Sequence, residues 1–212
     1  MEQTPRETGH GLIYIEYISR LPGVELREFH TAQRQAQQGW AQAHPEDVLL
    51  WSAGRTWRLG PEPEYLAVWY TPGAGLERID AWDAIFRSGT DEHLEQPARQ
   101  VSRIDLAGCY TPLLPPTTAH GGCYYVEYFR LTGALEGVRA LYERRTAAAP
   151  ELKLTLLAHR IGHLGPDPGG IAVWTIPNFA ALPAVAHALE GVRDPLELVH
   201  AGTYHDTGQE IL

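Results

Sequence analysis

The stretch LGPEPEYLAVWYTP, residues 59–72, recurs as LGPDPGGIAVWTIP at residues 164–177, without a gap and with acidic and aliphatic residues in matching places. Other blocks repeat in the same order: YIEYISRL (14–21) returns as YVEYFRL (125–131), and LAGCY (106–110) returns as HAGTY (200–204). Self-similarity over a long period is typical of a duplicated structural unit. The sequence therefore predicts two related units, each about half of the 212-residue chain.

Each unit has the pattern strand, helix, strand, strand, helix, strand. The strands are rich in β-branched and aromatic residues, and Pro-Gly pairs mark the turns. Helical spacing marks two apolar faces in the first unit, one with Phe29 and Trp40 and one with Ile79 and Trp82. This order is the ferredoxin-like βαββαβ topology. The predicted units span 1–110, with an extra loop or short helix at about 87–102 that could act as a lid, and 123–212, with a linker at 111–122.

A βαββαβ unit packs its helices on one face of its sheet and leaves the other face bare. The fold class is therefore predicted as α+β, with two fused ferredoxin-like units whose sheets pack face to face as a pseudo-dimeric α+β barrel. Strand alternation separates two sets of side chains. We expect the aliphatic set, such as Leu66 and Val68, to face the helices, and Tyr14, Glu16 and Trp69 to face the space between the sheets.

Composition excludes several classes of protein. With 44% hydrophobic residues the chain can bury a core, and its net charge of −9 disfavours nucleic acids and anionic membranes as partners. No apolar run suits a membrane helix, and the polar N-terminus predicts no secretory signal. Two cysteines form neither a disulfide framework nor a zinc site. We expect a cytoplasmic protein with a small-molecule ligand.

The paired motifs resemble those of the dimeric α+β barrel superfamily, with both subunits fused in one chain, and within it the NIPSNAP-like family. That family opens with a Tyr-Glu strand and Pro-Gly, as at 14–23, and its middle has a Gly-Pro turn before an aliphatic strand ending in Trp, as at 59–70 and 164–174. The chain departs from it at Ala67 and Ala172, where the family often has His, and at Ile18 and Phe129, where it often has Arg. The resemblance implies a superfamily of cofactor-independent monooxygenases, haem-dependent and haem-degrading enzymes and ligand sensors, and membership does not select one activity.

Glu16 and Glu127 are the first catalytic candidates, because a carboxylate on a half-enclosed strand face can act as a general acid or base. Arg55 and Arg160 would anchor an anionic group. The structural alternative pairs each Glu with a repeated Arg as an ion pair that fixes the sheets. Retention in both units favours that alternative, since catalysis needs one copy of a site.

The ligand-binding candidates are aromatic residues that could line an apolar pocket between the sheets. They could equally be inter-unit core, since aromatic residues dominate buried interfaces. The set is Tyr14, Trp69, Tyr110, Tyr125, Trp174 and Tyr204.

Three histidines of the second unit have no counterpart in the first: His159, His163 and His200. His159 and His163 are four apart on a predicted strand, roughly 13 Å, which is too far to share a metal ion. Each could be a single axial haem ligand, or an ordinary half-exposed histidine.

Three functions remain open. The first is a cofactor-independent, monooxygenase-like enzyme acting on an aromatic or apolar substrate in the inter-sheet pocket. The second is a haem or metal protein that uses one histidine, and the third is a non-catalytic ligand-binding or structural module. No cofactor is expected under the first, haem under the second. Because the duplication supplies a two-fold partner, we expect a monomer or homodimer.

Overall fold

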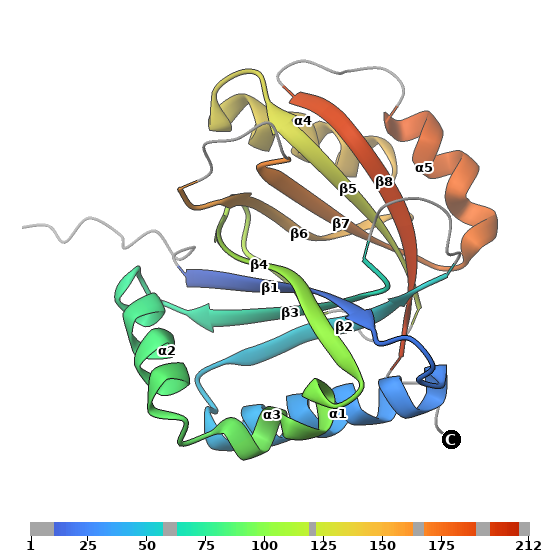
Figure 1. Ribbon diagram of the computed structural model, residues 1–212. Helices are drawn as coiled ribbons and strands as arrows, with labels where there is room; N and C mark the ends of the chain where they lie inside the picture. Colours follow the sequence, from blue (N-terminus) through green and yellow to red (C-terminus); the bar gives the residue numbers. More distant parts are fainter. Residues whose placement is uncertain (1–10, 57–62, 119–121, 163–167, 190–195, 208–212) are drawn as a thin grey trace, which may run out of the picture.

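The computed structural model describes residues 11–56, 63–118, 122–162, 168–189 and 196–207. Within these ranges, eight antiparallel strands close into one barrel, and the helices lie outside it (Figure 1). The first half has β1 (Gly11–Arg20), α1 (Leu26–Ala43), β2 (Val48–Arg55), β3 (Tyr65–Pro72), α2 (Glu77–Ser88), α3 (Glu92–Arg99) and β4 (Ser102–Pro112). The second has β5 (Cys123–Leu131), α4 (Leu135–Ala148), β6 (Lys153–Arg160), β7 (Gly170–Ile176), the 3-10 turn η1 (Phe179–Ala181), α5 (Leu182–Leu189) and β8 (Leu196–Asp206). The predicted α+β fold class is confirmed.

The two halves use the same strand pairing. Each central strand, β1 or β5, lies between the third and fourth strands of its own half. The Glu of each central strand lies opposite two alanines: Glu16 faces Ala67 and Ala107, and Glu127 faces Ala172 and Ala201. In both halves the pairing with the fourth strand shifts register just beyond that Glu. The backbone around the two glutamates is therefore equivalent.

The two sheets face each other and are joined along their edges. β2 pairs with β8 at 53–55, and β4 pairs with β6 at 110–112. Pairing at both seams satisfies the backbone groups that isolated edge strands would leave exposed. An eight-stranded barrel has an interior just wide enough for side chains to fill it.

The predicted orientation of the side chains was wrong. The barrel interior holds the aliphatic set, with Ile13 and Ile15 of β1, Val126 of β5 and their neighbours on β3 and β7, all buried. The residues predicted to face it point outward beneath the helices instead, as Trp174 does in the core of the second half. Strand alternation separates the two sets of side chains, but it does not show which set faces the barrel interior. The closed interior excludes water, so it takes the set of side chains that carries no charge, in which aromatic residues such as Tyr17 and Trp51 pack beside the aliphatic ones. The set that contains Glu16 and Glu127 lies in the sheet–helix layers instead.

The helices form one outer layer on each sheet. In Figure 1, α1, α2 and α3 cover the first sheet, and α4 and α5 cover the second. The turn into α1 uses Gly23 at φ +85°, and α2 ends at Gly89 at φ +66°, both conformations that favour glycine. The extra stretch of the first half contains the short helix α3, which packs against α1. The first sheet therefore carries three helices and the second carries two.

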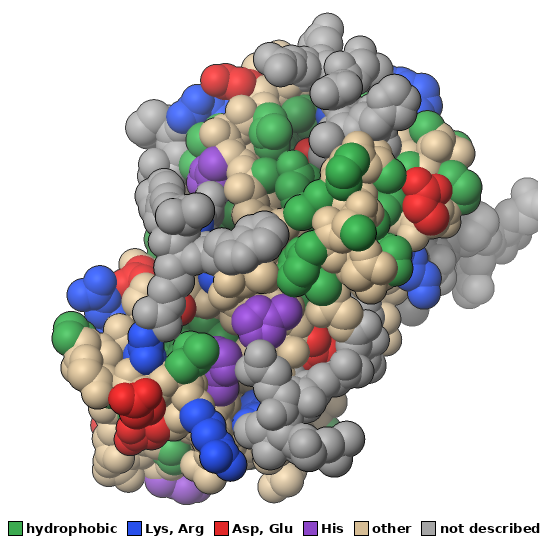
Figure 2. Space-filling model, turned by 90° about the vertical axis from the view of Figure 1, so that its right-hand side faces the viewer, with side chains coloured by type: hydrophobic (Ala, Val, Ile, Leu, Met, Phe, Trp, Pro, Cys, Tyr) green, Lys and Arg blue, Asp and Glu red, His purple; other side chains and the backbone are tan. Residues whose placement is uncertain are grey.

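The outer surface is mixed in character. No helix in the described ranges is long and apolar enough to span a membrane. On the face shown in Figure 2, hydrophobic side chains gather in the upper half, whereas acidic and basic side chains intermingle in the lower half. Among the described residues of this face, the basic side chains are separate from one another and form no continuous basic surface of the kind that phosphate backbones require.

Candidate functional site

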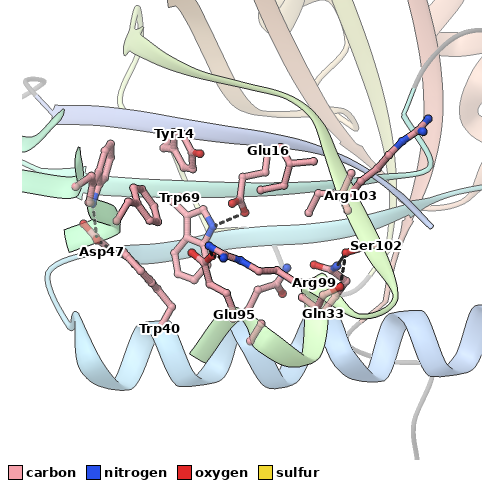
Figure 3. Close-up of a pocket in the computed structure, with 17 residues that line it drawn as sticks. Tyr14, Glu16, Gln33, Trp40, Asp47, Trp69, Glu95, Arg99, Ser102 and Arg103 are labelled. Atoms are coloured by element: carbon pink, nitrogen blue, oxygen red, sulfur yellow. Dashed lines mark hydrogen bonds and ion pairs between the residues drawn. The ribbon is translucent and has the colours of Figure 1, made fainter. Parts of the chain in front are cut away.

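A cavity of about 280 Å³ lies between the first sheet and its three helices (Figure 3). Its floor is the outer face of the sheet, and its walls are helical. The lining residues used below are Tyr14 and Glu16 of β1, Trp69 of β3, Gln33, Ala36 and Trp40 of α1, and Glu95 and Arg99 of α3. A cavity with aromatic walls and a few polar groups is typical of a small-molecule site.

Glu16 is the carboxylate of the cavity floor. Its Oε2 accepts a hydrogen bond from Trp69 Nε1 at 3.3 Å, and Figure 3 shows its side chain pointing from the sheet toward the helices. Burial raises the pKa of Glu16 to about 7, with Glu95 adding to the rise and the Trp69 hydrogen bond opposing it. Burial also raises the pKa of the neighbouring Tyr14 hydroxyl, with the Glu16 charge adding to it. Glu16 can therefore gain or lose a proton near neutral pH.

Asp47 holds the aromatic wall in place. It is 2% exposed and accepts hydrogen bonds from the indoles of Trp40 at 3.1 Å and Trp82 at 2.9 Å. It also accepts from Thr71 Oγ1 at 2.6 Å and forms an ion pair with Arg78 at 2.7 Å. Burial alone would raise the pKa of Asp47, but these donors together lower it. The carboxylate stays ionised and fixes one indole from α1 and one from α2.

Helix α3 closes the cavity from the side with a charged pair. Arg99 Nη2 lies 2.6 Å from Glu95 Oε2, and Arg99 Nη1 lies 3.4 Å from Glu92. Below it, Gln33 Nε2 donates to Ser102 Oγ at 2.7 Å, which ties α1 to the start of β4. The extra segment of the first half thus forms part of the cavity wall.

The equivalent place beside Glu127 in the second half is filled. Glu127 is 1% exposed and accepts hydrogen bonds from Trp174 Nε1 at 2.8 Å and from the Tyr142 hydroxyl at 3.0 Å. Arg145 Nη1 lies 3.6 Å from Glu127 Oε1, and its guanidinium lies 5.0 Å from the centre of the Tyr142 ring. Burial raises the pKa of Glu127, while Arg145 and the two hydrogen bonds act against that rise. The carboxylate is thus surrounded by the protein's own side chains.

Helix composition accounts for the difference. Counted from the first residues of α1 and α4, Gln33 stands where the second half has Tyr142, and Ala36 stands where it has Arg145. The smaller side chains leave a volume that the phenol ring and guanidinium occupy in the second half. Because α1 is four residues longer than α4, counting from the last residues of the two helices gives a different match: Gln37 for Tyr142 and Trp40 for Arg145. On that count Asp47, two residues after Pro45, corresponds to the buried Leu152.

The predicted aromatic set does not form one site. Tyr14 and Trp69 line the first-half cavity. The others lie elsewhere: Tyr110 and Tyr204 in the barrel interior, and Tyr125 and Trp174 in the sheet–helix layer of the second half.

The predicted pairing of Glu127 with Arg160 was wrong. The cation of Glu127 is Arg145 of α4, because Glu127 points outward, whereas Arg160 lines a second pocket at the mouth of the barrel. That pocket, of about 420 Å³, also contains Tyr110 and His200. Arg55 lies at the opposite seam, across from Tyr204 of β8. The four charged candidates are therefore distributed over separate places.

The histidine candidates are also separated. His159 pairs with Gly170 across β6 and β7, and the ring of His200 stacks on Tyr128 at 4.3 Å between centroids. His163 lies outside the described residues. Within the described ranges, no group of three or more His, Cys, Asp and Glu side chains is placed to hold a metal ion.

Sequence reasoning missed Asp47, Gln33 and Ala36. Helical spacing assigns Trp40 and Trp82 to apolar helix faces but does not reveal the carboxylate between them. The available signal was the set of positions at which the two halves of the sequence differ in side-chain size and charge.

The barrel has relatives among solved structures. No family model matches the sequence, and no curated protein matches it. The candidate chlorite dismutase TA0507 superposes with a TM-score of 0.61 at 10% identity, covering 94% of this chain and 96% of that one. Chlorite dismutase of Candidatus Nitrospira defluvii gives 0.58 at 13% identity as a mutant in complex with cyanide (95% and 92% covered), and 0.57 at 13% identity in complex with imidazole (95% and 93% covered). At these identities the likeness establishes the α+β barrel fold.

Proposed function

We propose that this chain is a small-molecule-binding α+β barrel and that the first-half cavity is its binding site. The observation that supports the proposal most is the open volume beneath Glu16, at the place where Tyr142 and Arg145 fill the second half. The aromatic wall is fixed by Asp47 before any ligand enters, and such preorganisation reduces the cost of binding. The solved chlorite dismutase complexes with cyanide and imidazole are consistent with small ligands on this fold.

Tryptophan fluorescence tests this proposal, because Trp40, Trp69 and Trp82 line the cavity. We expect p-cresol and indole to change the emission with a saturable dependence. Gln33→Tyr, which fills the cavity, should abolish the change. Leu106→Ala in the barrel-mouth pocket is the matched control and should leave the titration unchanged. Equal titrations in wild type and Gln33→Tyr would refute the cavity as the site.

A catalytic role is the second candidate, favoured by the pKa of about 7 at Glu16. A general base works best when its pKa lies near the working pH. In the monooxygenase-like hypothesis, Glu16 would accept a proton from an aromatic substrate bound in the cavity. We expect Glu16→Gln to abolish substrate-dependent oxygen uptake while Tm changes by only a few degrees. Uptake that persists in Glu16→Gln would overturn this role.

Haem does not fit the donor set of the first-half cavity. None of the described residues that line it is His, Cys or Met, and Tyr14 would have to bind iron as a phenolate that its buried surroundings disfavour. The haem hypothesis therefore depends on a single histidine such as His200. Titration with haemin checks it: a Soret band that His200→Ala removes would support haem at the barrel mouth. The NIPSNAP-like relationship and the tandem duplication likewise stay predictions.

A further inference from the structure

In the second half, Arg145 and Tyr142 fill the space beside the glutamate that is a cavity in the first half. The guanidinium of Arg145 lies on the Tyr142 ring and beside the Glu127 carboxylate. Tyr142 donates to the same carboxylate at 3.0 Å, and the indole of Trp174 completes the surroundings. A cation on a phenol ring therefore satisfies a buried carboxylate–indole pair in this fold.

The first half has the same carboxylate–indole pair but no side chain that places a cation beside it. Glu16 and Trp69 form the same carboxylate–indole pair at 3.3 Å, in the same strand register. The residues of α1 that line the cavity, Gln33, Ala36, Gln37 and Trp40, carry no positive charge.

The nearby cations are already bound to other groups. Arg99 is held by Glu95 and Glu92, and Arg103 pairs with Asp105 at 2.7 Å. Among the described residues, no Arg or Lys lies within ion-pair distance of Glu16. The polar and charged groups lining the cavity are Tyr14 and Glu16 of β1, Trp69 of β3, Gln33, Gln37 and Trp40 of α1, Asp47, Trp82 of α2, Glu95 and Arg99 of α3, and Ser102 and Arg103 of β4.

We propose that the first-half cavity binds an organic cation, an ammonium or guanidinium group carried on an aromatic ring, with Glu16 as its counter-ion and the ring against the aromatic wall. This inference rests on the proposed function. A cation beside a half-buried carboxylate forms a charge-assisted hydrogen bond, and indole and phenol faces attract it further. An anion of the same shape would be repelled by the Glu16 carboxylate, because the cations of the lining, Arg99 and Arg103, are already paired with Glu95 and Asp105.

Three probes with the same phenol ring separate charge from shape: tyramine is cationic, tyrosol is neutral and 4-hydroxyphenylacetate is anionic. Isothermal titration calorimetry at pH 8 should give tyramine an affinity at least tenfold above that of tyrosol, with 4-hydroxyphenylacetate weakest. Glu16→Gln should lower tyramine to the level of tyrosol and leave tyrosol unchanged. At pH 6 the preference for tyramine should shrink about fivefold to tenfold, since Glu16 is then mostly protonated and the amine, with a pKa of about 10, stays charged.

The outcomes distinguish the inference from the proposed function. Equal affinities for tyramine and tyrosol, unaffected by Glu16→Gln, would overturn the proposal that the ligand is a cation. The proposal that the cavity is a ligand-binding site would still hold. Binding of all three probes that persists in Gln33→Tyr, or no binding of any probe, would overturn both.

A second experiment needs no ligand. Ala36→Arg places a guanidinium where the second half has Arg145, and Ala36→Met adds a side chain of similar length without charge. We expect Ala36→Arg to have the higher Tm at pH 8, and the difference to fall at pH 5.5, where Glu16 is protonated. Equal Tm values for the two variants at both pH values would contradict a cation-accepting site.

Discussion

The two sheet–helix layers of this barrel share one strand pairing and differ in the helices that cover the sheet. In the second half, Tyr142 and Arg145 of α4 bury Glu127 to 1% exposure. In the first half, Gln33 and Ala36 of α1 leave a cavity above Glu16. Strand register is the same around both glutamates. The comparison teaches that the helices, rather than the sheet, decide whether the space beside the glutamate is core or cavity.

The carboxylates of Glu127 and Glu16 therefore have different roles. A buried carboxylate costs free energy unless a cation and hydrogen bonds compensate it. Glu127 has this compensation within the chain, which makes it part of the core. Glu16 has it only from Trp69, so its charge depends on pH and on what enters the cavity.

The largest expected effect comes from opening the filled layer. Arg145→Met leaves Glu127 buried without its cation, and removal of one partner from a buried pair costs about 3–5 kcal/mol. Urea unfolding measures the loss. The double variant Arg145→Met with Glu127→Gln should recover much of it, because no buried charge is left. If Arg145→Met alone were as stable as the double variant, the ion pair between Arg145 and Glu127 would not stabilise the second half.

The next effect concerns the wall of the open layer. Asp47→Asn removes the charge that binds Arg78 and two indoles and should lower the free energy of unfolding by roughly 2–3 kcal/mol. Probe binding in the cavity should weaken with it. Asp83→Asn is the control, since its pair with Arg87 is exposed and should contribute little. Similar losses in both variants would mean that Asp47 is not a special anchor.

The pH dependence of stability sharpens the comparison further. Because the pKa of Glu16 rises from 4.5 to about 7 on folding, the folded state binds one more proton than the unfolded state between these pH values. Stability should therefore fall as pH rises through this window, by roughly 1–3 kcal/mol, and stay level above it. Glu16→Gln should remove this part of the slope in denaturation curves recorded from pH 4.5 to 8. An unchanged slope would place the titration elsewhere.

The smallest effect is expected from making the first half resemble the second. Gln33→Tyr fills the cavity but loses the hydrogen bond to Ser102, so we expect a net gain of about 0.5–1.5 kcal/mol by calorimetry. Gln38→Tyr on the exposed side of α1 is the matched control and should change little. A clear loss of stability in Gln33→Tyr would show that the open volume does not match a tyrosine ring.

The candidate site could be predicted only in part. Periodicity found Tyr14, Glu16 and Trp69 as one face of two strands, and the structure places all three at the cavity. It did not predict the opposite wall, because Asp47 is recognisable only through donors that arrive from β3, α1 and α2. Of the predicted aromatic set, Tyr110 and Tyr204 lie between the two sheets, in the barrel interior.

The sequence by itself determined the element order, the two-fold repetition of strand and helix patterns, and the division of each strand into two sets of side chains. These follow from local propensity and periodicity, which are properties of neighbouring residues. Only the tertiary structure decided which set lies inside, because a closed interior without water takes the uncharged set and leaves the two glutamates to the sheet–helix layers. It also decided that one glutamate is core and the other lies at a cavity, because the volumes of Gln33, Ala36, Tyr142 and Arg145 matter only once helix and sheet pack together.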